Sequence, residues 1–126
     1  MIKKEHLIDA VICRQDDSVL EVSRILRDTQ RRHLVVLDSQ DKPVGVISAV
    51  DVNNRVVAEE KQPEQLSAIK IMTKNVRVVS VEDTYEKAFQ TMAALGTYSI
   101  PVVRNGKLLG LLEFNTAFKF KQPGGN

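Results

Sequence analysis

The chain has 126 residues, 43% of them hydrophobic, which suits one compact domain with a packed core and excludes an intrinsically disordered chain. Its 18 basic and 16 acidic residues give a formal net charge of +2, so the charge does not favour nucleic acid or a membrane surface as a partner. No segment has the length of a transmembrane helix or the apolar run of a signal peptide, and we therefore expect a cytoplasmic protein.

The first half of the chain predicts five elements in the order strand, helix, strand, strand and helix, over residues 11–13, 19–26, 33–38, 43–48 and about 50–60. Ser18 is expected to cap the first helix, and Glu21 to complete a capping box. A polar turn at residues 39–42 joins the second and third segments into a hairpin. Cys13, the only cysteine, lies in the first apolar strand and is expected to be a buried structural residue.

The second half predicts the same order of elements, over residues 76–79, 85–92, 100–104, 108–114 and 116–121. Asp83 and Thr84 supply the helix cap, Gly96 suits the end of that helix, and Asn105-Gly106 predicts a tight hairpin turn. These elements divide the chain into a first repeat (1–60), a linker (61–70), a second repeat (71–121) and a flexible tail (122–126).

The two halves are also similar in sequence. The matching blocks are Asp16-Asp17-Ser18 with Glu82-Asp83-Thr84, Leu34–Leu37 with Ile100–Val103, and Gly45-Val46-Ile47 with Gly110-Leu111-Leu112. The first two pairs are offset by 84 − 18 = 66 residues, and the third by 110 − 45 = 65. Three blocks in the same order at a nearly constant offset predict an internal structural repeat.

Three motifs of this repeat resemble the cystathionine-β-synthase (CBS) domain family, whose paired form is called a Bateman module. They are Ile71-Met72-Thr73 followed by Val76 and Val78, the strand Ser99–Val103, and Gly45-Val46-Ile47-Ser48-Ala49-Val50-Asp51. The resemblance covers nearly the whole chain. It implies an α/β (α+β) fold of two tandem β-α-β-β-α repeats with pseudo-twofold symmetry and sheets packed face to face. In the family, clefts between the repeats commonly bind AMP, ADP, ATP, S-adenosylmethionine or NAD.

Ser48 and Asp51 lie where a returning strand is expected to enter a helix. A carboxylate at such a junction can accept two hydrogen bonds from a ribose diol, and a hydroxyl can reach sugar or phosphate. Spacing alone favours a capping box between the two residues. The repeat and the family resemblance add weight to ribose binding, and the two roles can coexist. Arg55 is expected to be a surface or ion-pair residue.

Arg31 and Arg32 directly precede the second strand, where AMP-binding members of the family place a basic residue against phosphate. Arg32 aligns best with that position, and a guanidinium can bind phosphate bidentately. The alternative is a solvated charge run after the end of a helix, where arginine is favourable. His33 could contribute, but a lone histidine is more often structural.

Apolar walls for an adenine base are expected from Ile12 and Val46, with Ile47 beside them in the motif, although core packing is the alternative role for each. Asn115 and Lys119 of the second repeat are candidates to reach the phosphates. The second repeat has Glu113 and Thr116 in place of Ser48 and Asp51, so its own site is predicted to be weak, empty or altered.

The sequence therefore predicts a non-catalytic sensor that binds an adenine nucleotide (AMP, ADP or ATP) between its repeats and needs no obligatory cofactor or metal. No Walker loop, dinucleotide-binding glycine motif or zinc-binding pattern occurs. The family resemblance implies a homodimer that acts on a regulated protein. The main alternative is a ligand-free dimerisation or protein-interaction module. Nucleic-acid binding through Arg31 and Arg32 ranks third, since aromatic residues make up only 5% of the chain.

Overall fold

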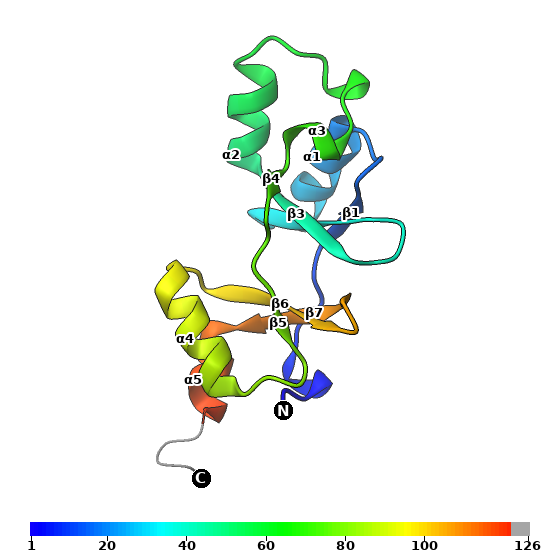
Figure 1. Cartoon of the computed structure of the whole chain (residues 1–126). Helices are drawn as coiled ribbons and strands as arrows, with labels where there is room; N and C mark the ends of the chain where they lie inside the picture. Colours follow the sequence, from blue (N-terminus) through cyan, green and yellow to red (C-terminus); the bar gives the residue numbers. More distant parts are fainter. Residues whose placement is uncertain (122–126) are drawn as a thin grey trace. The chain divides into compact units, whose positions relative to one another are not determined.

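The computed structural model describes residues 1–121, which form two structural units (Figure 1). The first-repeat unit is Val11–Val76, and the second-repeat unit combines Met1–Ala10 with the chain from Arg77 onward. Each unit has one sheet and its own hydrophobic core. The tail predicted over residues 122–126 lies outside the described residues. None of the helices in the described part of the chain has the length and apolar character that crossing a bilayer requires.

The sheet of the first-repeat unit has the strand order β1-β2-β3-β4. Its strands are β1 (Ile12–Arg14), β2 (His33–Leu37), β3 (Pro43–Ser48) and β4 (Thr73–Lys74). β1 is parallel to β2, whereas β2–β3 and β3–β4 are antiparallel pairs. The first three strands agree with the sequence-based expectation to within one residue at each end. The sequence analysis did not predict β4, because its pairing partner is remote in the chain.

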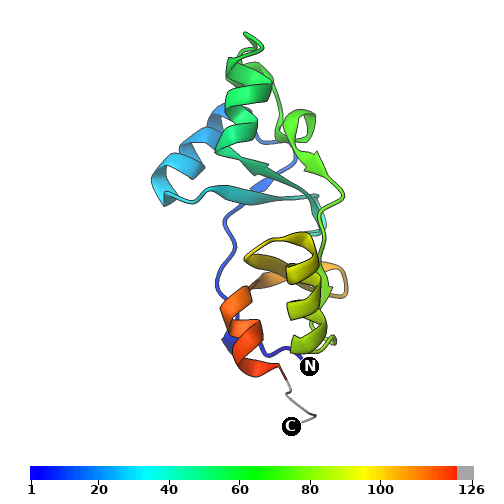
Figure 2. The same ribbon diagram turned by 90° about the vertical axis from the view of Figure 1, so that its left-hand side faces the viewer.

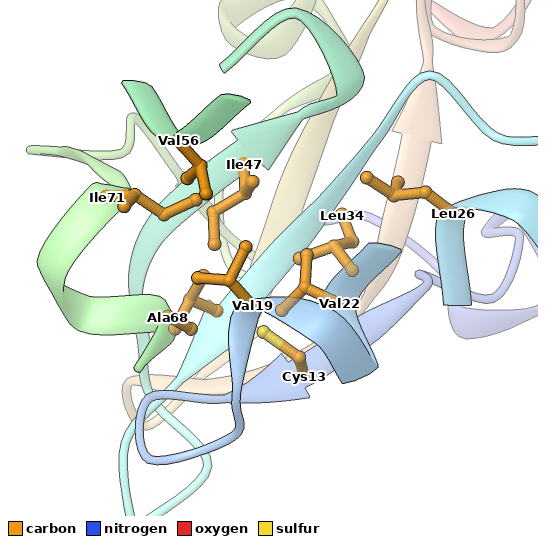
Figure 3. Packing of buried hydrophobic residues seen from close by; sticks show 10 residues of the cluster. Cys13, Val19, Val22, Leu26, Leu34, Ile47, Val56, Ala68 and Ile71 are labelled. Atoms are coloured by element: carbon orange, nitrogen blue, oxygen red, sulfur yellow. The ribbon is translucent and has the colours of Figure 1, made fainter. Parts of the chain in front are cut away.

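Helix α1 (Val19–Thr29) begins where the sequence analysis expects it, because the side chain of Ser18 caps its first turn. The Oγ atom of Ser18 accepts a hydrogen bond from the N–H group of Glu21 at 3.1 Å, which satisfies one of the free donors at the helix start. One face of α1 packs against the sheet, and Figure 3 shows its side chains among core residues from β1, β2 and β3. The core residues of these elements are Cys13, Val19, Val22, Leu26, Leu34, Val36 and Ile47.

Helix α2 (Ala49–Val52) lies beside α1 on the same face of the sheet (Figures 1 and 2). It has only four residues and continues as a π-helical turn, η2 (Asn53–Val57). The helix expected over about residues 50–60 is therefore present, but it is shorter and its second half is a π-helical turn. The segment is rich in valine and asparagine, which are weak helix formers, and it ends at Glu60 with a left-handed φ of 57°.

The second-repeat unit repeats this plan with the strand order β5-β6-β7 and the helices α4 and α5. Its elements are β5 (Val79–Ser80), α4 (Tyr85–Leu95), β6 (Ser99–Arg104), β7 (Lys107–Glu113) and α5 (Phe114–Phe120). Thr84 caps α4, and Gly96 ends it with a φ of 69°. Asn105 and Gly106 have φ values of 53° and 81°, as the predicted tight turn requires. Of the strand predicted over residues 76–79, only Val79 lies in β5.

The strand pairing confirms that the sequence duplication is a structural repeat. Cys13 pairs with Val36 in the first-repeat unit, and Val79 pairs with Val102 in the second, an offset of 79 − 13 = 66 residues for both partners. In each unit the antiparallel register shifts directly after this pair. The same irregularity at the same place indicates that the two units share their backbone plan in detail.

Each sheet gains a pairing from the segment that leads into the other repeat. β4 pairs with β3 of the first-repeat unit, and Ile8 forms a bridge to β7 of the second. Glycine makes both approaches possible. A Cβ atom at Gly45 would lie 2.5 Å from Sδ of Met72, and one at Gly110 would lie 3.0 Å from the carbonyl oxygen of Ile8. Each compact unit therefore contains the segment that leads into the other repeat, which we call an exchanged entry segment. The boundaries expected from the sequence instead assign each such segment to the repeat that follows it.

The connection between the repeats is partly structured. The short turn η3 (Pro63–Gln65) is followed by α3 (Ala68–Ile71), whose Ala68 and Ile71 are buried in the core of the first-repeat unit. The N–H group of Ala68 donates to the carbonyl oxygen of Asp17 at 2.8 Å. The segment expected to be a linker over residues 61–70 is thus anchored to the first-repeat unit at its C-terminal end.

Candidate functional site

The junction between β3 and α2 carries the first two candidate residues, Ser48 and Asp51. The Oγ atom of Ser48 accepts a hydrogen bond from the N–H group of Asp51 at 3.1 Å. The Oδ2 atom of Asp51 accepts one from the N–H group of Ser48 at 2.9 Å, so the capping box is complete. The box fixes the Asp51 carboxylate against the backbone, and its side chain is 17% exposed.

Arg55 holds the other oxygen of this carboxylate. Its Nη2 atom lies 3.5 Å from Oδ1 of Asp51, and its Nη1 atom donates to the carbonyl oxygen of Ile71 at 2.6 Å. The ion pair agrees with the role expected for Arg55, but the contact with Ile71 was not expected. The spacing of four residues between Asp51 and Arg55 is the sequence signal for the pair. A carboxylate has about four acceptor positions, so Asp51 keeps acceptor capacity for a ligand.

Arg32 lies directly beside this junction because its carbonyl oxygen accepts a hydrogen bond from the N–H group of Ala49 at 3.1 Å. His33 pairs with Ser48 across the two strands. Arg31 and Arg32 are exposed, and neither forms an ion pair within residues 1–121. Two cationic side chains are therefore available next to the capping box.

The two apolar candidates Ile12 and Val46 share one face of the sheet. Ile12 pairs with Val35, which in turn pairs with Val46, so the three side chains form a row across β1, β2 and β3. The alternate residues Cys13 and Ile47 point to the opposite face and belong to the core under the helices. Ile47 is 0% exposed, so its side chain is a core residue rather than part of the wall expected from the sequence.

The junction between β7 and α5 has the same backbone arrangement with different side chains. The N–H group of Phe114 donates to the carbonyl oxygen of Tyr98 at 2.7 Å, which is the counterpart of the Ala49–Arg32 bond. Glu113 occupies the N-cap position but makes no side-chain cap hydrogen bond. The second junction therefore has no capping box, and the weak, empty or altered second site expected from the sequence stays a prediction. Asn115 and Lys119 lie on α5 in this unit, and their contribution to a nucleotide site stays a prediction.

The remaining candidate groups have structural surroundings. Cys13 is 3% exposed, and burial, with a smaller effect of the nearby Asp17 charge, raises its pKa to about 12. The expected buried role is confirmed. Nδ1 of His6 lies 2.6 Å from the hydroxyl oxygen of Tyr85, and its ring stacks on Phe120 with centroids 3.9 Å apart, contacts that the sequence did not predict. Within residues 1–121, no group of three or more His, Cys, Asp or Glu side chains could hold a metal ion.

These features define a tandem-repeat α/β module, and comparison with known proteins gives its family. The family model described as "CBS domain" matches residues 4–58 and 67–119, so the chain belongs to the CBS domain family and contains two tandem repeats of it. CBS-domain modules are generally regulatory.

The relatives are distant. An uncharacterised protein of Methanopyrus kandleri, MK0525, is 27% identical over 82% of this chain and 54% of its own length. The CBS domain-containing protein CBSCBSPB2 of Arabidopsis thaliana is 28% identical over 89% of this chain and 21% of its own length. The chain thus spans about half or less of the length of these curated relatives. The solved structure of CBSX2 in complex with AMP has a TM-score of 0.72 and 20% identity, over 92% of both chains.

Proposed function

We propose that this chain is a regulatory module that binds an adenine nucleotide, AMP, ADP or ATP, at the β3–α2 junction of the first-repeat unit and catalyses no reaction. The observation that carries the proposal is the geometry of Asp51. The capping box and Arg55 fix its carboxylate at the end of β3 and leave acceptor positions free. A ribose with two adjacent hydroxyl groups is the ligand that such a carboxylate suits.

The surroundings of Asp51 match the other two parts of a nucleotide. Arg32 and Arg31 stand beside the junction without an ion pair in the described chain, and guanidinium groups suit phosphate. The sheet face that carries Ile12 and Val46 offers an apolar surface for the base. That CBSX2, which shares this fold, was solved with AMP also supports the proposal.

Regulation in this proposal follows from differential affinity. A nucleotide that binds one arrangement of the module more tightly than another shifts the population toward it, and a partner protein reads the change. We also propose that two copies of the chain pair, as the family resemblance implies. Exposed apolar side chains on the helical segments of both units support pairing, among them Val50 at 64% and Phe118 at 59% exposure.

The test is thermal unfolding of the purified protein with AMP, ADP, ATP, S-adenosylmethionine and NAD. A ligand at about one hundred times its dissociation constant adds roughly 2.7 kcal/mol of stability, which raises the Tm by several degrees. Asp51→Asn should abolish this rise, because the amide offers one acceptor oxygen in place of two. Ser18→Ala is the matched control. It removes the cap of α1 in the same unit and should lower the Tm while keeping the ligand-induced rise.

One observation favours a second function, that of a ligand-free interaction module. Both carboxylate oxygens of Asp51 already have partners within the protein, the N–H group of Ser48 and the guanidinium of Arg55. In this second account Ser48 and Asp51 act only as a cap. None of the five nucleotides would then raise the Tm, and Asp51→Asn would leave partner binding unchanged.

A further inference from the structure

The two exchanged entry segments correspond to each other residue by residue. Thr73 of one segment pairs with Val46, and Ile8 of the other pairs with Leu111. The offsets are 73 − 8 = 65 residues for the entry segments and 111 − 46 = 65 residues for their partners. In each segment a short helical turn, α3 or η1 (Lys4–His6), ends two residues before the paired residue. The last residues of these two turns are therefore equivalent positions.

The last residue of each turn is contacted from the same position of its unit. Nη1 of Arg55 donates to the carbonyl oxygen of Ile71 at 2.6 Å. The ring of Phe120 stacks on the ring of His6 with centroids 3.9 Å apart. Arg55 and Phe120 are equivalent, because 120 − 55 = 65 is also the offset between the starts of α2 and α5, 114 − 49. Both units therefore use this position to attach an entry segment, through a hydrogen bond in one and ring stacking in the other.

Arg55 also contacts a residue of the proposed nucleotide site, and this distinguishes the two attachments. Its Nη2 atom lies 3.5 Å from Oδ1 of Asp51, whereas the residue equivalent to Asp51 in the second repeat is Thr116, which has no carboxylate. Ile71 is the last residue of α3, and the carbonyl groups at a helix end have no partner within the helix. One planar guanidinium thus joins the Asp51 carboxylate to the end of α3, with its nitrogen atoms in a fixed geometry.

The segment that Arg55 contacts has unequal attachment along its length. At its start, Ala68 is buried and its N–H group donates to the carbonyl oxygen of Asp17 at 2.8 Å. Beyond Ile71, the chain forms the two-residue strand β4, whose side chains are exposed, and Arg77 then begins the second-repeat unit. Short elements with exposed backbone are those that open locally at a low cost in free energy. We expect such opening at residues 71–76.

We propose that Arg55 is a positioning residue that couples nucleotide binding at Asp51 to the attachment of residues 71–76. The inference rests on the proposed nucleotide site and adds its regulation. Arg55 holds the Asp51 carboxylate in the arrangement that accepts the ribose hydroxyl groups, so a nucleotide binds this state more tightly. By linkage, a bound nucleotide raises the population in which Arg55 is in place and residues 71–76 are attached. The effect of the nucleotide thereby reaches the chain that enters the second-repeat unit.

The first test needs no variant and measures amide hydrogen exchange by NMR, with and without saturating AMP, ADP or ATP. The N–H group of Met72 donates to the carbonyl oxygen of Ala68 at 3.0 Å, and its exchange should slow by about fivefold or more on binding. The equivalent amide of the other entry segment, Leu7, donates to the carbonyl oxygen of Lys4 at 3.0 Å and should not respond. Equal slowing at Met72 and Leu7 would mean a general stabilisation and would overturn the coupling.

The second test uses Arg55→Met, which removes both contacts with a side chain that has no charge. Without nucleotide, Met72 should exchange faster in this variant, and saturating nucleotide should no longer slow it. The core amide of Val35 should still slow in both proteins, because a bound ligand stabilises the whole unit. The dissociation constant of the nucleotide should rise by about fivefold or more. Phe120→Leu is the matched control, since it weakens the other attachment and should leave the response of Met72 unchanged.

The outcomes separate the coupling from the nucleotide site itself. A nucleotide that binds Arg55→Met and still slows Met72 as in the original chain would overturn the coupling and leave the site intact. If Arg55→Met does not fold, the comparison of Met72 with Leu7 in the original chain decides. A Tm and an exchange pattern that none of the three nucleotides changes would overturn the site and the coupling together.

Discussion

The β3–α2 junction of the first-repeat unit and the β7–α5 junction of the second share one backbone and differ in their side chains. In both, the first N–H group of the helix donates to the carbonyl oxygen of the residue just before the neighbouring strand, Arg32 before β2 and Tyr98 before β6. The first junction adds the Ser48–Asp51 capping box, and the second has Glu113 without a side-chain cap. Apolar residues at equivalent positions give both halves the same fold, whereas the polar pair is present in only one of them.

The same difference extends to the helix faces. The first-repeat unit combines a hollow between α1 and α2, lined in part by Ser23 and Ala49, with arginines and a fixed carboxylate, and the second combines stacked phenylalanines with an exposed ring. A duplicated fold can thus divide its roles. The proposed nucleotide site accordingly belongs to the first-repeat unit alone.

The largest expected effect compares the two glycines that admit the exchanged segments. A Cβ atom at Gly45 would meet Sδ of Met72 at 2.5 Å and the carbonyl oxygen of Thr73 at 2.8 Å, whereas the nearest contacts at Gly110 are 3.0 Å and 3.1 Å. Overpacking costs about 1–3 kcal/mol, and Gly45→Ala should lie at the upper end because backbone must move. Gly110→Ala should cost less. Urea unfolding of both variants measures the difference. Equal losses in the free energy of unfolding would show that the two entry segments pack equally tightly against their glycines.

The capping box gives the next largest effect. Ser48→Ala should destabilise the protein by about 1 kcal/mol, because the N–H group of Asp51 loses its acceptor. The double variant Glu113→Ser with Thr116→Asp installs the same box at the second junction and should add up to about 1 kcal/mol. Urea unfolding again provides the measurement. A double variant with no gain would mean that the second junction differs in backbone as well as in side chains.

The smallest effect concerns Cys13, whose counterpart in the second-repeat unit is Val79. Burial raises the pKa of the Cys13 thiol from 9.0 to about 12, so the folded protein favours the neutral thiol. Above pH 9 the unfolded chain loses this proton first, and the stability that the neutral thiol contributes falls as the pH rises toward 12. Through this group, the free energy of unfolding falls by at most about 1.4 kcal/mol per pH unit.

Cys13→Val makes the two units alike at this position. It should remove the part of the fall in stability above pH 9 that comes from the thiol. The comparison is between the two proteins at each pH, so that pH effects common to both cancel. Parallel stability curves for the variant and the original chain between pH 9 and pH 10.5 would contradict the assignment.

The elements and the repeat could be predicted from the sequence because their signals are local. Ser18, Thr84 and the Asn105–Gly106 turn act within a few residues, and alternating apolar residues mark the strands. The exchange of entry segments could not be predicted, since β4 pairs with a strand more than twenty residues away. Helix α3 was not predicted either, because its four residues, although mostly apolar, are too few to show a helical pattern.

The candidate site was predicted in part. The sequence pointed to Ser48 and Asp51 and left cap and ligand roles open, and the structure establishes the cap. Ile47 proved to be a core residue, because strand alternation turns it toward the helices while Val46 faces the other way. The hollow at Ser23 and Ala49 was missed. Small residues signal a hollow only once their repeat counterparts, Phe89 and Phe114, are seen to stack.

The central claim is that the first junction, and not the second, binds an adenine nucleotide. The most direct test is titration of the isotopically labelled protein with AMP, ADP or ATP, followed through its backbone amide resonances by NMR. The account predicts saturable shifts at Arg32, Ser48 and Asp51 that vanish in Asp51→Asn, with Glu113 and Thr116 far less affected. No saturable shift with any of the three nucleotides, or shifts centred on Glu113 and Thr116, would contradict it.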